Sequence, residues 1–163
     1  MLKGDRIPRA RDIMTKKLTC LSEDDLVYDA VRKLLARKIS GAPVIDSRRR
    51  LVGVLSEKDC IRAAMRAYHD GLPSPNVGQV MTREPVSVKE ETNVVTIAHL
   101  FATSPFRRIP VVREGDVLIG QISRRDLLKA VASVLEPSRG RKASPLYLSA
   151  LDDAEITAEI TLG

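Results

Sequence analysis

Two serine–aspartate pairs are the residues of this chain whose types and spacing could do chemistry. Ser56 and Asp59 lie in the stretch VGVLSEKD, and Ser123 and Asp126 lie in the stretch IGQISRRD, 67 residues later. A serine at a helix start with an acid three positions on is a capping box, which satisfies backbone amides that lack helical partners. The same geometry suits a nucleotide, because a helix N-terminus favours phosphate and a carboxylate accepts the paired hydroxyls of a ribose. The two interpretations are compatible, and both stay open here.

The two pairs belong to an internal duplication. Aligning residues 12–64 with residues 79–131 without a gap gives eleven identical positions in 53, whereas ordinary composition gives roughly three or four. The chain is therefore expected to fold as two copies of one unit.

Each copy predicts the order β-α-β-β-α. A short strand precedes a helix of about three turns, which has a cap candidate at Ser22 in the first copy. APVID with RRRLVGVLS, and IPVVR with VLIGQIS, predict hairpins, the second one turning at residues 114–116. EKDCIRAAMRAY and RRDLLKAVASVL predict closing amphipathic helices. The helical stripes of the first helices are Leu26, Val27, Ala30, Val31, Leu34 and Leu35, and Val94, Val95, Ile97, Ala98, Phe101 and Ala102.

The predicted fold class is α/β (α+β), with two β-α-β-β-α units packed with pseudo-twofold symmetry. Neither unit of about 55 residues could bury both faces of a three-stranded sheet alone. We expect a first unit with its N-terminal lead-in at 1–69, a linker at 70–77 that contains two prolines and a glycine, and a second unit at 78–135. A basic linker and C-terminal tail follow at 136–163.

Composition narrows the classes of function. The net charge is +6, but the basic residues are dispersed and aromatic residues make up only 3%, which argues against nucleic-acid binding as the main function. No apolar run is long enough to cross a membrane. Two cysteines without a CxxC motif, and no secretory signal, favour the cytoplasm. The only histidines, His69 and His99, are not at zinc-ligand spacing, and no catalytic motif is present, so we expect neither a metal site nor an enzyme.

The chain resembles a tandem pair of cystathionine-β-synthase (CBS) domains, also called a Bateman module, here standing alone. The resemblance rests on DIMT and QVMT at the start of each unit, APV and IPV entering the hairpins, and GVLSEKD and GQISRRD closing them. It implies adenosine-compound binding in clefts between the two units, a regulatory role and often a homodimer. It implies no catalytic cofactor. AMP, ADP or ATP is the expected ligand, while S-adenosylmethionine or NAD remains an alternative.

The resemblance also implies two sets of ligand-binding residues. The arginines, which bind phosphate bidentately, make the Asp126 cleft the expected main phosphate site. The residues of this main cleft are Thr19, Ile39, Ser40, Arg107, Arg108, Gln121, Ser123, Arg125 and Asp126. The residues of the second cleft are Val54, Ser56, Lys58, Asp59 and Val86.

The function predicted from the sequence is that of a regulatory module. It would sense an adenosine-containing metabolite and signal through a partner protein or its own dimer. Two alternatives stay open: a ligand-independent oligomerisation scaffold, and a nucleic-acid-associated protein that uses its basic surface and tail.

Overall fold

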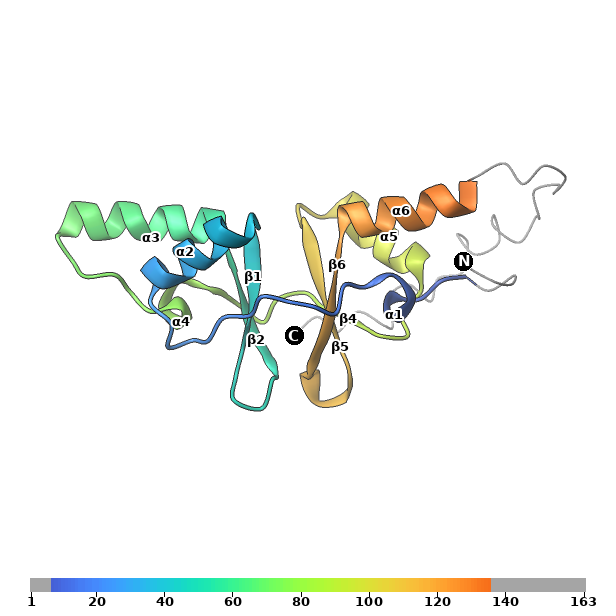
Figure 1. Ribbon diagram of the computed structural model, residues 1–163, viewed down its shortest axis with the longest axis horizontal. Coiled ribbons are helices and arrows are strands. Elements are labelled where there is room, and N and C mark those ends of the chain that lie inside the picture. The colour runs from blue at the N-terminus through green and yellow to red at the C-terminus, as the bar shows by residue number, and fades with distance from the viewer. Residues whose placement is uncertain (1–6, 136–163) are drawn as a thin grey trace, which may run out of the picture. The chain divides into compact units, whose positions relative to one another are not determined.

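The computed structural model describes residues 7–135, and it contains two β-sheets flanked by helices (Figure 1). The predicted tail at 136–163 and the first six residues lie outside the described part. The elements in chain order are α1 (Ala10–Ile13), α2 (Val27–Arg37), β1 (Gly41–Ile45), β2 (Leu51–Ser56), α3 (Glu57–Asp70), α4 (Val77–Val80), β3 (Thr82–Arg83), β4 (Val88–Lys89), α5 (Val94–Thr103), β5 (Arg108–Val112), a 3-10 turn (Glu114–Asp116), β6 (Leu118–Ser123) and α6 (Arg124–Leu135).

Each sheet has three strands, in the orders β1-β2-β3 and β4-β5-β6. Strands β1 and β2 form an antiparallel hairpin in which Gly41 lies opposite Ser56, with a bulge after Val44. The second copy follows the predicted order β-α-β-β-α from β4 to α6. In the first copy a single parallel bridge between Leu21 and Val44 stands in place of the leading strand. The predicted fold class is confirmed.

The described residues divide into two compact units. The sheet-A unit comprises residues 17–85 and 112–119 and contains β1-β2-β3. The sheet-B unit comprises residues 7–16, 86–111 and 120–135 and contains β4 with most of β5 and β6. The division predicted from sequence, with its linker at 70–77, stays a prediction. In that linker region, α3 ends at Asp70, and its C-cap residue Gly71 adopts a left-handed conformation with φ of 63°, as glycine does readily.

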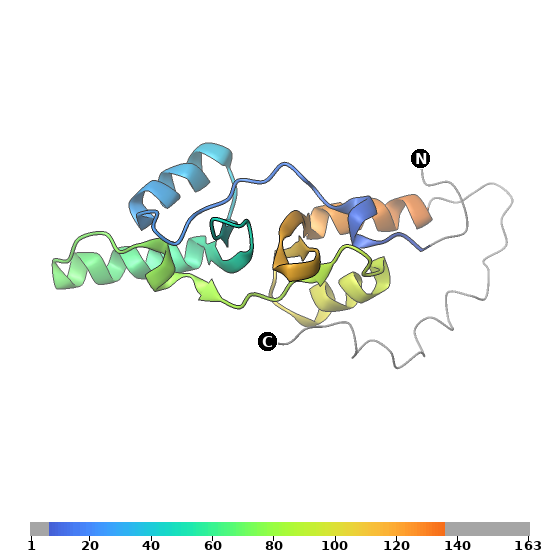
Figure 2. The same ribbon diagram turned by 90° about the horizontal axis from the view of Figure 1, so that it is seen from below.

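The opening segment of each repeat belongs to the sheet of the other repeat. Thr15 bridges Gln121 of β6, and α1 contacts α6 in the sheet-B unit. Thr82 of β3 pairs with Val54 of β2, and α4 contacts α3 in the sheet-A unit. Figure 2 shows α1 beside α6 and α4 beside α3. Each sheet is therefore completed by residues from both copies of the duplication.

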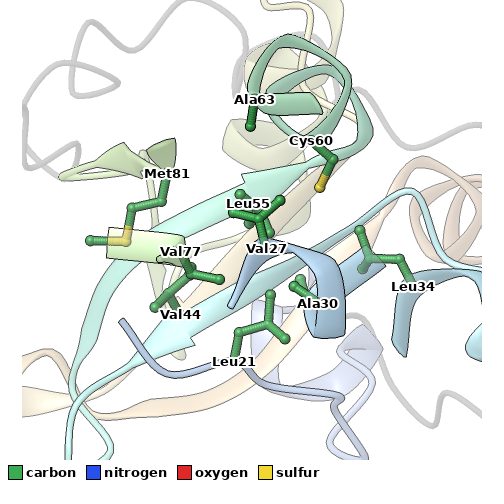
Figure 3. Packing of buried hydrophobic residues seen from close by; sticks show 11 residues of the cluster. Leu21, Val27, Ala30, Leu34, Val44, Leu55, Cys60, Ala63, Val77 and Met81 are labelled. Carbon is green, nitrogen blue, oxygen red and sulfur yellow. The ribbon is translucent and has the colours of Figure 1, made fainter. Parts of the chain in front are cut away.

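The core of the sheet-A unit lies between the sheet and helices α2 and α3 (Figure 3). Aliphatic side chains fill it, as the near absence of aromatic residues predicts. Its buried residues are Leu21, Val27, Ala30, Leu34, Ala42, Val44, Leu55, Cys60, Ala63, Val77 and Met81.

The start of α2 differs from its prediction. Leu26, not Ser22, occupies the N-cap position, and it makes no side-chain capping bond. Ser22 instead forms a turn with Asp25, whose backbone N–H donates to the Ser22 carbonyl at 3.2 Å. Asn93, which aligns with Leu26 in the second repeat, does cap α5 by accepting from the N–H of Thr96 at 2.9 Å. The prediction of a cap at Ser22 was wrong, because this polar residue lies four positions too early and is used by the turn.

Helical periodicity also predicted more buried residues on the first helix of each repeat than the structure contains. Leu26 and Leu35 are exposed although they share the helical spacing of Val27 and Leu34. Ala102 is exposed as well. No helix among residues 7–135 is long and apolar enough to cross a membrane.

Candidate functional site

The two serine–aspartate pairs occupy equivalent positions at the starts of α3 and α6. In α3, Asp59 Oδ2 accepts from Ser56 Oγ at 2.6 Å and from the Ser56 backbone N–H at 2.9 Å. In α6, Asp126 Oδ2 accepts from Ser123 Oγ at 2.6 Å and from the Ser123 N–H at 2.9 Å. The capping interpretation is therefore confirmed in both repeats.

Capping employs one carboxylate oxygen of each aspartate. Among the hydrogen bonds of residues 7–135, those accepted by Asp59 and Asp126 all go to Oδ2. Both side chains are half-buried. Oδ1 thus keeps its lone pairs for two hydroxyl donors, which is the arrangement that a ribose diol needs.

The helix starts offer fewer backbone donors than the sequence suggests. The first amide of α3 donates to the Ser40 carbonyl at 3.0 Å, and that of α6 donates to the Arg107 carbonyl at 3.3 Å. The third amide in each helix donates to the cap serine, at 3.3 Å for Asp59 and 3.2 Å for Asp126. Of the first three amides, only the second, from Lys58 or Arg125, lacks a partner within the described residues. A phosphate at either helix start would depend on side chains more than on the helix itself.

The side chains around the two pairs carry different charges. In the sheet-B unit, four arginines lie in the two segments that lead to Ser123 and Asp126. The four aligned positions in the sheet-A unit carry no net charge. Arg107 and Arg125 are exposed, and Arg108 is half-buried. Arg124, which the sequence analysis did not assign to the site, is exposed and donates from its guanidinium to the Ser104 carbonyl at 3.3 Å. The repeat alignment, which pairs Arg124 with Glu57 at the 67-residue offset, is the sequence feature that could have identified Arg124 as a site residue. The equivalent positions in the sheet-A unit are Ser40, Gly41, Glu57 and Lys58.

The structure groups the predicted site residues by sheet. The sheet-B unit holds Arg107, Arg108, Gln121, Ser123, Arg125, Asp126 and Val86. The sheet-A unit holds Thr19, Ile39, Ser40, Val54, Ser56, Lys58 and Asp59. The predicted main cleft combines residues from both units, and so does the second cleft, so these combinations stay predictions.

A methionine–glycine contact fixes the opening segment next to each pair, and sequence reasoning did not identify it. A Cβ at Gly120 would lie 2.4 Å from Met14 Sδ, and a Cβ at Gly53 would lie 2.4 Å from Met81 Sδ. The identical pairs Met14/Met81 and Gly53/Gly120 in the repeat alignment are the sequence feature that could have identified this contact. Each thioether covers the strand that leads into the serine three residues later.

The described residues contain no cluster suited to metal binding, and neither of the two thiols is activated. No cluster of three or more histidine, cysteine or acidic side chains occurs among residues 7–135. Burial, and then the neighbouring Asp59 carboxylate, raise the pKa of the Cys60 thiol. Burial raises the pKa of Cys20 as well, against the charge of Arg49. Both thiols are therefore protonated at neutral pH, and neither is an activated nucleophile.

Comparison with known sequences assigns the family. The model of the CBS domain matches residues 10–66 and 77–133. A region of inosine-5'-monophosphate dehydrogenase from Methanocaldococcus jannaschii is 31% identical over 123 residues, which cover 76% of this chain and 23% of that enzyme. The chain thus spans less than a quarter of that relative.

Solved structures are similar over the same part of the chain. CBSX2 of Arabidopsis thaliana in complex with AMP is 31% identical, with a TM-score of 0.70, over 77% of this chain and 97% of that one. The cytosolic domain of the Mg²⁺ channel MgtE in complex with ATP is 29% identical, with a TM-score of 0.64, over 74% of this chain and 48% of that one. The serine–aspartate pairs lie within the two matched regions. The chain belongs to the CBS domain family and carries two copies of the domain.

Proposed function

We propose that this protein is a regulatory module that binds an adenosine-containing metabolite, with AMP, ADP or ATP as the expected ligand. The observation that carries the proposal is the repeated aspartate that uses only Oδ2 for capping, combined with arginines at the Asp126 pair. Similarity to CBSX2, whose structure contains AMP, supports it. The module has no catalytic role of its own in this proposal.

The Asp126 pair would bind the ligand through three kinds of contact. The Asp126 Oδ1 atom accepts the two ribose hydroxyls, while Oδ2 continues to cap α6. The N–H of Arg125 is a donor for a phosphate oxygen. Arg107 and Arg108 add guanidinium groups, which stay charged at any relevant pH and bind phosphate bidentately. Gln121 lies two residues before Ser123 on β6 and completes this half of the main cleft.

The remaining predicted residues form the rest of the two clefts in this proposal. Thr19, Ile39 and Ser40 complete the main cleft, and Val86 joins Val54, Ser56, Lys58 and Asp59 in the second. The second cleft has one basic side chain where the main cleft has several. A ligand with a positive charge, such as S-adenosylmethionine, therefore fits the second cleft better, and NAD is the other alternative to an adenine mononucleotide.

The signal would leave the module through a homodimer or a regulated protein partner. A ligand shifts a conformational equilibrium only by its difference in affinity for the two states, so output requires that one conformation binds more tightly. We place the protein in the cytoplasm, where its two free thiols, Cys20 and Cys60, remain reduced.

A thermal-shift series with AMP, ADP, ATP, NAD and S-adenosylmethionine tests the proposal. A ligand that binds only the native state stabilises it by about 2.7 kcal/mol at a hundredfold excess over Kd. Asp126→Asn separates capping from binding, because the amide oxygen can still accept from Ser123 while the NH2 group cannot accept a ribose hydroxyl. We expect the variant to stay folded and to lose the shift with the adenine mononucleotides.

Asp59→Asn is the matched variant, and it should keep the shift that comes from the main cleft. If millimolar concentrations of all five compounds leave the melting temperature unchanged, the pairs are caps only and the scaffold function takes the place of this proposal. Binding of DNA or RNA that falls steeply with salt would favour the nucleic-acid function instead.

A further inference from the structure

Helix α5 ends differently from its repeat equivalent α2. In α2 the C-cap residue Lys38 adopts a left-handed conformation with φ of 53°, and its N–H donates to the carbonyls of Leu34 and Leu35. In α5 the C-cap residue Ser104 is extended, with φ of −129° and ψ of 153°, because Pro105 follows it and disfavours helical backbone there. Helix α2 thus closes with a left-handed turn, whereas α5 continues directly into an extended segment.

Arg124, the first residue of α6, holds this extended segment at both ends. Its guanidinium donates to the Ser104 carbonyl at 3.3 Å, and its backbone N–H donates to the Arg107 carbonyl at 3.3 Å. Helices α5 and α6 contact each other, as Figure 1 also shows. The Ser104 carbonyl follows the last turn of α5, where carbonyls lack helical partners. We call these two bonds, which together span residues 104–107, the Arg124 brace.

The first repeat has the backbone bond of this brace without the side-chain bond. The N–H of Glu57, which aligns with Arg124, donates to the Ser40 carbonyl at 3.0 Å. An ionised carboxylate only accepts hydrogen bonds, so the Glu57 side chain cannot donate to a carbonyl. The helix dipole favours a glutamate at the first helical position and disfavours an arginine. Helix stability therefore does not account for the arginine at position 124.

The braced segment carries two of the arginines proposed to bind phosphate. Arg107 is exposed at its end, and Arg108 is half-buried at the start of β5. Neither takes part in an ion pair among residues 7–135, and the same holds for Arg124 and Arg125. A loop that is already held in its bound conformation binds more tightly, because less ordering is left for the binding step. The Arg124 brace therefore favours anion binding by Arg107 and Arg108.

The backbone at the start of β5 also distinguishes the two repeats. Gly41, at the start of β1, aligns with Arg108, and a Cβ at Gly41 would lie 2.8 Å from the Leu55 carbonyl oxygen. A side chain can occupy that position only if the backbone shifts. The second repeat accommodates the Arg108 side chain at the equivalent position. The brace and the arginine at the strand start are therefore features of the second repeat alone.

We propose that Arg124 is a positioning residue for the phosphate groups of the nucleotide. It keeps residues 104–107 in one conformation, so that Arg107 and Arg108 are held ready at the Asp126 pair. Arg124 acts through these two arginines and not by contact with the ligand. Affinity for ATP therefore depends on the brace, while affinity for adenosine does not. This inference rests on the proposed function and adds to it a residue that determines selectivity for phosphate.

Calorimetric titration of ATP and adenosine into Arg124→Ala tests the positioning role. Loss of the pre-ordered conformation should weaken ATP roughly three- to tenfold and leave adenosine within about twofold. In a double-mutant cycle, Arg124→Ala should have little further effect on ATP when Arg107→Gln and Arg108→Gln are already present. Additive losses would show that Arg124 acts on phosphate directly or by its charge, and they overturn the positioning role. Glu57→Ala, the matched control in the first repeat, should leave ATP affinity unchanged.

NMR relaxation of the ligand-free protein tests the brace itself. The backbone N–H order parameters of Phe106 and Arg107 should fall from about 0.85 toward about 0.6 in Arg124→Ala. They should stay high in Arg125→Ala, which removes the same charge one residue away. Unchanged order parameters in Arg124→Ala overturn the brace.

The two measurements also separate failure of this inference from failure of the proposed function. If the unmodified protein binds neither ATP nor adenosine, the proposed function fails and this inference fails with it. If the unmodified protein binds ATP and Arg124→Ala binds it equally well, the inference alone is overturned.

Discussion

At the residue scale, one aspartate in each repeat has two functions that do not compete. Asp59 and Asp126 each accept two bonds from their cap serine through Oδ2, and Oδ1 is the atom proposed to bind ribose. A substitution of either aspartate that lowers stability can therefore also lower ligand binding. Stability and ligand binding need separate measurements.

The cap serines contribute measurable stability. Ser56→Ala and Ser123→Ala each remove the hydroxyl that accepts from the third amide of the helix and donates to the aspartate. We expect each substitution to lower the free energy of unfolding by about 1 kcal/mol, measured by urea denaturation. Ser47→Ala, in an exposed turn, is the control and should change it by less than about 0.5 kcal/mol. Equal effects at all three positions would contradict the capping role.

Asp46 makes stability depend on pH in the acid range. The backbone N–H of Arg50, with its guanidinium and the N–H of Arg48, holds the pKa of Asp46 below its ordinary value. Because the folded pKa lies below the unfolded value of about 3.9, this stabilisation is present above about pH 4 and is lost as pH falls through the folded pKa.

Asp46→Asn should therefore unfold at a lower urea concentration than the unmodified protein at pH 6, and the two midpoints should converge as pH falls through the folded pKa of Asp46. Urea titrations between pH 2.5 and 6 measure this difference. A difference between midpoints that is constant across the range would show that Asp46 acts by shape and not by charge.

At the element scale, the exchange of opening segments ties the two repeats together. Met14 covers Gly120 on β6, and Met81 covers Gly53 on β2. Each methionine comes from the opening segment of one repeat, and that segment completes the sheet of the other repeat. The residues next to each serine–aspartate pair are therefore fixed by packing between segments that are distant in the chain.

Gly120→Ala tests this packing. The three atoms nearest to its added Cβ belong to the Met14 side chain, at 2.4, 2.8 and 3.1 Å, so we expect a loss of about 1–3 kcal/mol from overpacking. Met14→Ala in the same chain should recover part of this loss in a double-mutant cycle. Gly53→Ala should be rescued less by Met81→Ala, because the Thr82 carbonyl would also lie 3.0 Å from the new Cβ. Additive effects at Gly120 and Met14 would contradict the contact.

At the scale of the whole molecule, the two copies of the fold have different charges near their serine–aspartate pairs. The sheet-B unit has four arginines where the sheet-A unit has a serine, a glycine, a glutamate and a lysine. In the proposed function, this difference makes the Asp126 pair the one that binds an anionic ligand.

Arg107→Gln with Arg108→Gln should weaken ATP more than AMP and leave adenosine nearly unchanged, because the number of charged phosphate contacts rises along that series. Calorimetric titration at two salt concentrations measures it, and the salt dependence should shrink in the variant. Arg48→Gln with Arg49→Gln, an exposed pair on the β1–β2 turn, is the matched control. An equal loss for adenosine would show that the arginines support the fold and not the phosphate contact.

The sequence by itself determined the duplication, the order of helix, hairpin and helix in each repeat, and the two serine–aspartate caps. These features depend on local spacing, so apolar periodicity and the 67-residue offset were sufficient. Only the tertiary structure decided which sheet receives Met14 and Met81, because both repeats offer the same glycine and local spacing favours neither. It also decided that Leu35 is exposed while Leu34 is buried, since periodicity gives the direction of a side chain but not the width of the surface that covers it. Those outcomes arise from packing between distant segments, which no local pattern encodes.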